Sequence, residues 1–300
     1  MLSFNSLYNR AAKMCGIPST DTTNLTFLKQ LINEKYHLIC DEENYTFLDA
    51  TKTSTTTAST QSYELPYNIG KLINVSVTIG GKKYYPQEIS KSRFDLINAQ
   101  GTSILSDYPQ FFTIFNDQIH FYPVFSSGSL TITFNYKKIV KDLSTDDYTT
   151  GTASITTGTS YTAITGVGTT WTAAMIGRYF KFNDDGFWYE ITSRTSNTVI
   201  AIKRSYGGSD VSGGNYTIGE MSIIPEAFQS ILWYGTMADF LRLKGDEYRS
   251  NLYDGKYNAL KVKLDNRYKT STTGQIIPPT NKIRAGGTIR SQNNYPESIG

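Results

Sequence analysis

The sequence has 300 residues, with 29 Lys and Arg against 26 Asp and Glu, a formal net charge of +3. This length allows one large or two smaller domains, and a hydrophobic content of 39% is enough for a packed core. No stretch approaches the roughly 18 consecutive apolar residues of a membrane span, and the N-terminus lacks the basic and apolar segments of a secretory signal. We therefore expect no membrane association and folding in a cytoplasm.

The charge is unevenly distributed. Residues 269–300 contain four cations and one acid, so the rest of the chain is balanced. A neutral body with a mildly basic tail is not typical of nucleic-acid binding, which needs many clustered cations. The four cations are Lys269, Lys282, Arg284 and Arg290.

The first 43 residues predict two helices. Ser3 can cap the first, which Gly16 and Pro18 end. The second follows the polar turn 19–24 and fades at 41–43. We expect these helices to pack antiparallel or on a third partner. Their apolar stripes are Phe4, Leu7, Tyr8, Ala11 and Ala12, then Leu28, Leu31, Ile32, Tyr36 and Ile39.

From residue 45 to about 136 the period changes from 3.6 to 2, which predicts strands. Segment 51–60 fits a strand or a loop, and 89–98 fits a short helix. The remainder predicts one small antiparallel sheet, a β-meander. Its parts are a hairpin of 72–79 and 82–85 around Gly80-Gly81, a hairpin of 111–115 and 119–122 around Asn116-Asp117, and a strand at 129–137.

Residues 150–220 are rich in Gly and Thr and show short strand-like pieces at 179–182, 187–191, 199–202 and 215–218. Short strands separated by regular turns predict a small all-β barrel or sandwich. We expect this domain to be inserted in a loop of a body formed by residues 1–149 and 221–269.

A helical hairpin is predicted after Pro225, which suits a first helical position. Lys244-Gly245-Asp246 separates its two helices. The first has a stripe of Phe228, Ile231, Leu232, Gly235, Ala238 and Leu241. The second has Tyr253, Tyr257, Leu260, Leu264 and Tyr268 on one face, and Lys256, Lys261, Lys263 and Asp265 on the other. The predicted fold class is thus α+β.

Residues 270–300 have no period and are rich in Gly, Pro, Ser and Asn. Such a segment cannot bury enough apolar surface on itself to become ordered, so we expect an extended arm held by a partner. The candidate anchors are single apolar residues and nearby cations: Ile276, Ile277, Ile283, Arg284, Ile289 and Arg290.

Several segments resemble phage head–tail adaptor proteins, also called connector or head-completion proteins. Segment 25–50 is similar to that family's second helix, although Tyr45 stands where a tryptophan is expected. SYELPYNIGKLINVSV at 62–77, the hairpin FFTIFNDQIHFYPVF, the strand LTITFNYKK and the closing helical hairpin at 224–267 are similar too. Segment 166–208 resembles a small β-module of phage structural proteins.

The resemblance implies a non-enzymatic virion protein without a cofactor, made in the host cytoplasm. It implies a twelve-copy ring at the portal vertex that binds the portal protein and later tail or nozzle proteins. DNA would pass through its lumen without sequence-specific binding. One alternative is a tail- or fibre-associated protein that binds carbohydrate through Trp171 and Trp188. Another is a peptidoglycan-degrading tail enzyme, which needs clustered catalytic carboxylates in a cleft.

Other motifs have simpler interpretations. Gly166-Val167-Gly168 lacks the remaining elements of a phosphate loop, so it predicts a turn. Asp184-Asp185-Gly186 lacks the other ligands of a calcium loop and predicts a hairpin turn. Trp171, Trp188 and Tyr189 are expected in the core of the β-domain.

The remaining candidate residues do not combine into a catalytic or metal site. The carboxylates fall at element ends, where solvated caps are the ordinary interpretation, and the cysteines are expected to pack in a core without a disulfide. The histidines are expected to be packing or surface residues. These residues are Asp41, Glu42, Glu43, Asp146 and Asp147, then Cys15 and Cys40, then His37 and His120.

Overall fold

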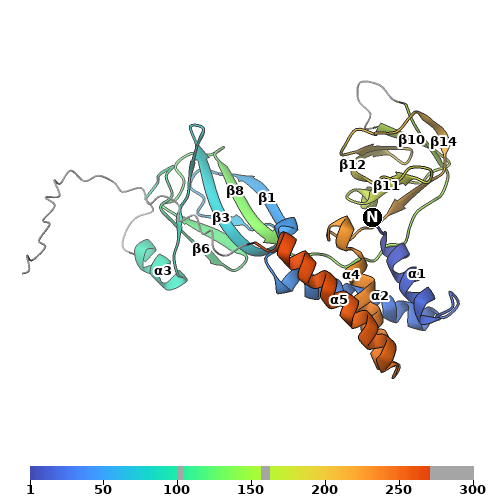
Figure 1. Cartoon of the computed structure of the whole chain (residues 1–300). Helices are drawn as coiled ribbons and strands as arrows, with labels where there is room; N and C mark the ends of the chain where they lie inside the picture. Colours follow the sequence, from blue (N-terminus) through green and yellow to red (C-terminus); the bar gives the residue numbers. More distant parts are fainter. Residues whose placement is uncertain (100–103, 157–162, 271–300) are drawn as a thin grey trace, which may run out of the picture. The chain divides into compact units, whose positions relative to one another are not determined.

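The structure is a computed structural model that describes residues 1–99, 104–156 and 163–270. Within these residues it has helices and several sheets, mostly antiparallel, so the predicted α+β class is confirmed (Figure 1). Three apolar cores are present, which belong to a helical body, a two-sheet sandwich and a curled sheet. The predicted arm lies outside the described residues, except for Thr270.

The helical body is built around α4, whose side chains are buried on nearly every side. The first two helices contact each other and also both pack on α4, which is the third partner of the sequence prediction. The second helix begins earlier than predicted, because Asp21 accepts a hydrogen bond from the Asn24 amide and caps it. The helices are α1 (Phe4–Cys15), α2 (Thr22–Glu42), η1 (Thr46–Leu48), η3 (Glu226–Phe228), α4 (Ser230–Leu243) and α5 (Glu247–Tyr268).

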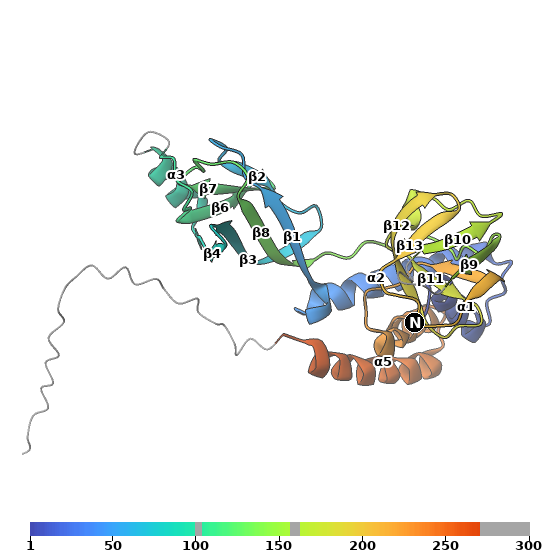
Figure 2. The same ribbon diagram turned by 90° about the horizontal axis from the view of Figure 1, so that it is seen from above.

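The β-meander differs from the prediction, because it contains two four-stranded sheets instead of one. The sheets have the orders β1-β8-β3-β4 and β2-β7-β6-β5. β6 and β7 of the second sheet lie close to β8 and β3 of the first (Figure 2), and apolar side chains of both sheets form one core. Val77 and Phe134 come from the first sheet, and Phe112 and Phe121 from the second. The elements are β1 (Asp49–Thr55), β2 (Ser62–Glu64), β3 (Ile69–Ile79), β4 (Lys82–Tyr84), β5 (Gln87–Glu88), α3 (Lys91–Ala99), β6 (Phe111–Phe115), β7 (Gln118–Tyr122) and β8 (Thr131–Lys138).

The curled sheet has seven strands in the order β14-β9-β10-β13-β12-β11-β15. Its two edge strands, β14 and β15, are separated in the chain only by Asn215, so the sheet has to curl until its edges approach. Trp171, Phe180 and Tyr216 fill the interior. The strands are β9 (Thr152–Ile155), β10 (Ala163–Val167), β11 (Tyr179–Phe182), β12 (Tyr189–Ser196), β13 (Val199–Ile202), β14 (Val211–Gly214) and β15 (Tyr216–Gly219), with η2 (Ala173–Met175) between β10 and β11.

Two sequence predictions for this sheet were wrong in part. Gly166 and Val167 belong to β10, and only Gly168 adopts the left-handed backbone of the predicted turn. A Cβ at Gly166 would lie 2.8 Å from the Trp171 ring and closer still to Thr169, so this strand position requires glycine. The strand predicted at 187–191 begins at Tyr189, and Phe187 is 72% exposed. Asp184 and Asp185 do form part of the predicted turn between β11 and β12.

Candidate functional site: the junction and the assembly surfaces

An extensive polar network lies where the chain enters and leaves the curled sheet. Tyr148 and Ile218 exchange two backbone hydrogen bonds of 2.9 Å. The guanidinium of Arg178, a residue only 6% exposed, donates to the carbonyls of Asp146 at 2.7 Å and Ile218 at 2.8 Å. Arg178 therefore joins the entering and leaving segments from inside the curled sheet.

The helical body completes this junction. Ser3 donates to Asp147, and Tyr8 donates to Asp146, each at 2.8 Å. Lys29 forms an ion pair with Asp146 at 3.1 Å. The expectation of solvated caps holds only in part: Asp146 is exposed but also binds Tyr8 of α1 and Lys29 of α2, whereas Asp147 is half-buried beside Ser3.

The two neighbouring carboxyls have opposite pKa shifts. Burial raises the pKa of Asp147 above its usual value, and the nearby Ser3 hydroxyl and Arg178 offset this only partly. Burial also acts on Asp146, but hydrogen bonds from Tyr8 and Lys29 outweigh it and lower the pKa. Ionisation of Asp147 therefore destabilises the fold, whereas the fold stabilises Asp146 in its charged form.

Glu220 directly follows β15, the last strand of the curled sheet, and holds the segment that enters this sheet. It is 4% exposed and accepts hydrogen bonds from the backbone amides of Ser144 and Thr145, both at 2.8 Å. Lys141 adds an ion pair at 3.0 Å. Although burial opposes ionisation, these donors lower the pKa of Glu220 below its usual value.

A second polar cluster joins the C-terminal ends of α2 and α5, which lie side by side (Figure 1). Lys261 is 9% exposed and pairs with Glu42 at 3.2 Å and Asp265 at 2.9 Å. Glu43 pairs with Lys269. Glu42 and Glu43 are thus ion-paired instead of simply solvated, and the placement of Lys261 on the outer face of α5 was wrong.

Tyr45 packs over Lys261, the buried member of this cluster. Its side chain is fully buried, and its hydroxyl donates to Asp265. Burial raises the pKa of Tyr45, and Asp265 adds to this effect. Its backbone carbonyl accepts a 2.7 Å hydrogen bond from Lys137 of the sandwich. A tryptophan at this position would lack the hydroxyl that Asp265 accepts from.

The histidines and cysteines do not converge on a reactive centre. His37 contacts Asp142 at 2.6 Å on the surface, and His120 packs near Phe94. Cys15 and Cys40 are free thiols in or against the core of the body, so the prediction for the cysteines is confirmed. Across residues 1–99, 104–156 and 163–270, no three His, Cys, Asp or Glu side chains gather as a metal site requires.

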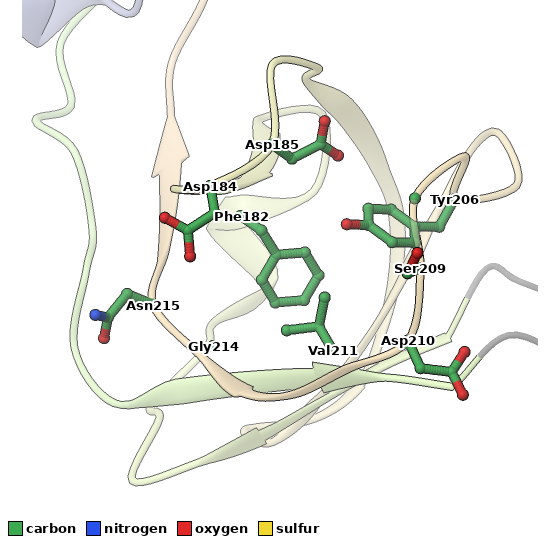
Figure 3. A pocket seen from close by; sticks show the side chains of 10 residues that line it. Phe182, Asp184, Asp185, Tyr206, Ser209, Asp210, Val211, Gly214 and Asn215 are labelled. Carbon is green, nitrogen blue, oxygen red and sulfur yellow. The ribbon is translucent and has the colours of Figure 1, made fainter.

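The curled sheet has a small pocket of about 260 Å³ (Figure 3). Phe182 and Val211 form part of its wall, and Asp184, Asp185 and Asp210 surround it without pointing to a common centre. The Phe182 ring and the nearby Tyr206 ring are 2% and 7% exposed. Neither pocket ring therefore offers the open face on which a sugar stacks.

The tryptophans of the curled sheet have different environments. Trp171 is 1% exposed, and its indole donates to Tyr216 at 2.9 Å, which argues against carbohydrate binding through this ring. Trp188 is half-buried outside the core, with the ammonium of Lys181 5.0 Å from its ring centre. The prediction of a core position was confirmed for Trp171 and Tyr189 and wrong for Trp188.

Large apolar side chains are exposed on all three parts of the described chain. The sandwich has ten, and most of the others lie on the helical body. Assembly proteins use such side chains to contact other subunits. Those on the body are Met14, Leu38, Leu243, Tyr248, Leu252 and Val262.

Comparison with known protein families gives a match. A family model described as SU10 adaptor protein matches residues 3–156, just over half of the chain. The chain belongs to the SU10 adaptor protein family. The match covers α1, α2, the sandwich and the entry to the curled sheet. A comparison with curated proteins finds no match.

Membership in the SU10 adaptor family identifies the chain as a phage structural adaptor protein, a component of the virion. A structural adaptor of this kind works by contacting other head and tail proteins. None of the helices in the described residues has the length and apolarity to span a membrane. The likeness of segment 166–208 to a phage β-module, and that of the closing helical hairpin, lie beyond the matched residues and stay predictions.

Proposed function

We propose that this adaptor forms a closed ring that joins the capsid portal to the tail, with viral DNA leaving through its lumen. The observation that carries this proposal is the family match over the helices and the sandwich. The polar clusters described above fasten parts of the chain to one another and do not form a substrate cleft. A structural role therefore fits the chain better than an enzymatic one.

A ring suits the physical demands on such a joint. A heterologous contact repeated around a closed ring lets many weak interfaces add up to a stable assembly. We propose twelve copies, which would match a twelve-fold portal one to one. The near neutrality of residues 1–268 would limit adhesion to DNA moving past the ring wall.

The C-terminal arm is proposed as the attachment to the portal or to a neighbouring subunit. Its isolated isoleucines would enter apolar pockets, and its arginines would pair with acidic groups on the partner. Residues 271–300 lie outside the described structure, so this role rests on their sequence. The proposed contacts are Ile276, Ile277, Ile283, Arg284, Ile289 and Arg290.

The test is co-expression of the chain with the portal protein of the same phage, followed by native mass spectrometry and electron microscopy. We expect a complex with one adaptor per portal subunit and a ring stacked on the portal. A chain that stays separate from the portal, or that binds it as single scattered copies, would contradict the proposal.

A further inference from the structure

The outer face of α5 has an apolar stripe that nothing in the described residues covers. Tyr248, Leu252 and Val262 are 85%, 52% and 58% exposed, and Gly255 and Ala259 between them are also exposed. Their spacing alternates between four and three residues, which is the pattern of a helix-packing seam. The buried face of the same helix uses other positions, including Tyr253 and Tyr257.

Gly255 leaves room for a close approach to this stripe. Glycine inside a helix costs about 1 kcal/mol relative to alanine. A Cβ at Gly255 would meet no atom within 4 Å, so packing within the described chain does not require glycine there. A small residue at this position becomes useful when a second helix packs against it.

The charges beside the stripe determine which kind of surface can pack on it. Arg249, Lys256 and Lys263 follow one edge of it at seven-residue intervals. Two copies of α5 packed antiparallel on this stripe would bring these cations together, which disfavours a symmetric pair. The complementary surface therefore has to be acidic and different from α5.

The exposed face of α2 meets these requirements. Leu38 is 52% exposed and lies between Glu34 and Asp41, which are also exposed. Neither acid forms an ion pair within the described residues, and neither does Lys263. Glu34 and Asp41 are seven residues apart, as Lys256 and Lys263 are, so both pairs span about 10.5 Å along their helices.

We propose that the outer face of α5 of one copy packs on the outer face of α2 of the next copy around the ring. Both helices turn their buried faces toward the core of the same body, so their outer faces are two different surfaces of one subunit. A contact between two different surfaces propagates head to tail and closes into a ring where the rotation allows. This inference rests on the proposed function and names the interface that would build the ring.

The test uses charge reversal in the full-length chain. We expect the double variants K256E/K263E and E34K/D41K each to reduce ring assembly with the portal at least tenfold. A mixture of the two should restore alternating rings, because each basic face then meets an acidic one. The control K82E/K83E, on exposed lysines of β4, makes the same charge change and should assemble like the wild type.

A cysteine pair tests the contact directly in folded protein. A259C mixed with L38C should form a disulfide between copies in assembled rings, whereas A259C alone should not dimerise through α5. The interface would be wrong if the wild type formed rings, both double variants assembled normally and no 38–259 cross-link appeared. The proposed function would be unaffected by that outcome. Absence of wild-type rings on the portal would contradict the proposed function, and a 38–259 cross-link formed without portal would still support the interface.

Discussion

At the scale of single residues, buried charges hold the parts of this adaptor together. Lys261 links α5 to α2 under the Tyr45 ring, and Arg178 links the curled sheet to the segment before it. Burial alone would lower the pKa of Lys261, but hydrogen bonds to Tyr45, Asp265 and Glu42 outweigh it and raise the pKa. The stability that the charged Lys261 side chain contributes to the fold is therefore fully present at every pH below the ordinary lysine pKa. It is lost only in strong alkali, where the pH rises through the raised pKa.

Replacing this lysine should destabilise the body. The variant Lys261→Ala leaves Asp265 and Glu42 without their cation, and we expect a loss of about 1.5–3 kcal/mol in the free energy of unfolding. The measurement is urea unfolding at pH 7. Lys263→Ala, an exposed lysine on the same helix, serves as the control and should change stability by less than about 0.5 kcal/mol. Equal effects of the two variants would show that Lys261 is not a structural cation.

The neighbouring acids Asp146 and Asp147 should respond oppositely to neutralisation. The raised pKa of Asp147 means that ionisation weakens folding at pH 7, so Asp147→Asn should increase the free energy of unfolding. This gain in stability should vanish as the pH falls below 3.8, the usual pKa of an aspartate carboxyl. Asp146→Asn should destabilise the protein at pH 7, and that loss should also disappear in acid. Urea unfolding between pH 3 and 7 measures the free energy of unfolding of both variants. Changes of the same sign in the two variants at pH 7 would contradict the opposite pKa shifts of Asp146 and Asp147.

At the scale of elements, periodicity in the sequence predicted the long helices and both hairpins well. α5 has a regular pattern over many residues, and Asn116-Asp117 adopts the left-handed backbone of a tight turn. Short strands were missed because their identity comes from pairing. β2 and β5 have three and two residues, and together with β6 and β7 they make the second sheet.

The candidate site was less predictable than the fold. The sequence predicted an exposed Lys261, because the helical pattern of α5 contains no information about its ion pair with Glu42 of α2. Asp146 and Asp147 looked like caps because their partners Tyr8 and Ser3 are more than a hundred residues away in the chain. A signal was present in Arg178 and Glu220, two charged residues set among the apolar strands, although sequence alone could not say that they face one junction.

The curled sheet should fold by itself. Tyr148 pairs with Ile218 and binds Thr170, so residues 148–219 include both closing segments, slightly more at the start than the predicted 150–220. We expect this fragment to show one cooperative urea transition, because its core of Trp171, Phe180 and Tyr216 is complete. Arg178→Ala should weaken the junction in the full chain more than it destabilises the fragment. A fragment without cooperative unfolding would show that the domain boundary is wrong.

At the scale of the whole molecule, the account separates a folded subunit from its assembly contacts. Truncation after Thr270 should leave the melting temperature nearly unchanged, because the described cores lie before this point. Capture by the portal should weaken strongly, since each isoleucine buried on a partner contributes about 1.5–3 kcal/mol. A pull-down with full-length and truncated chains measures this, and unimpaired capture of the truncated chain would show that the arm is not an anchor.

The ratio of this chain to the portal protein in purified virions tests the ring most directly. Isotope-labelled reference peptides from both proteins allow quantitative mass spectrometry to give that ratio. A twelve-copy ring on a twelve-fold portal predicts a ratio of about one to one, with release of both proteins in one complex when the virion is dissociated. A ratio several-fold above or below one, or release of the chain with fibres instead of the portal, would contradict the ring.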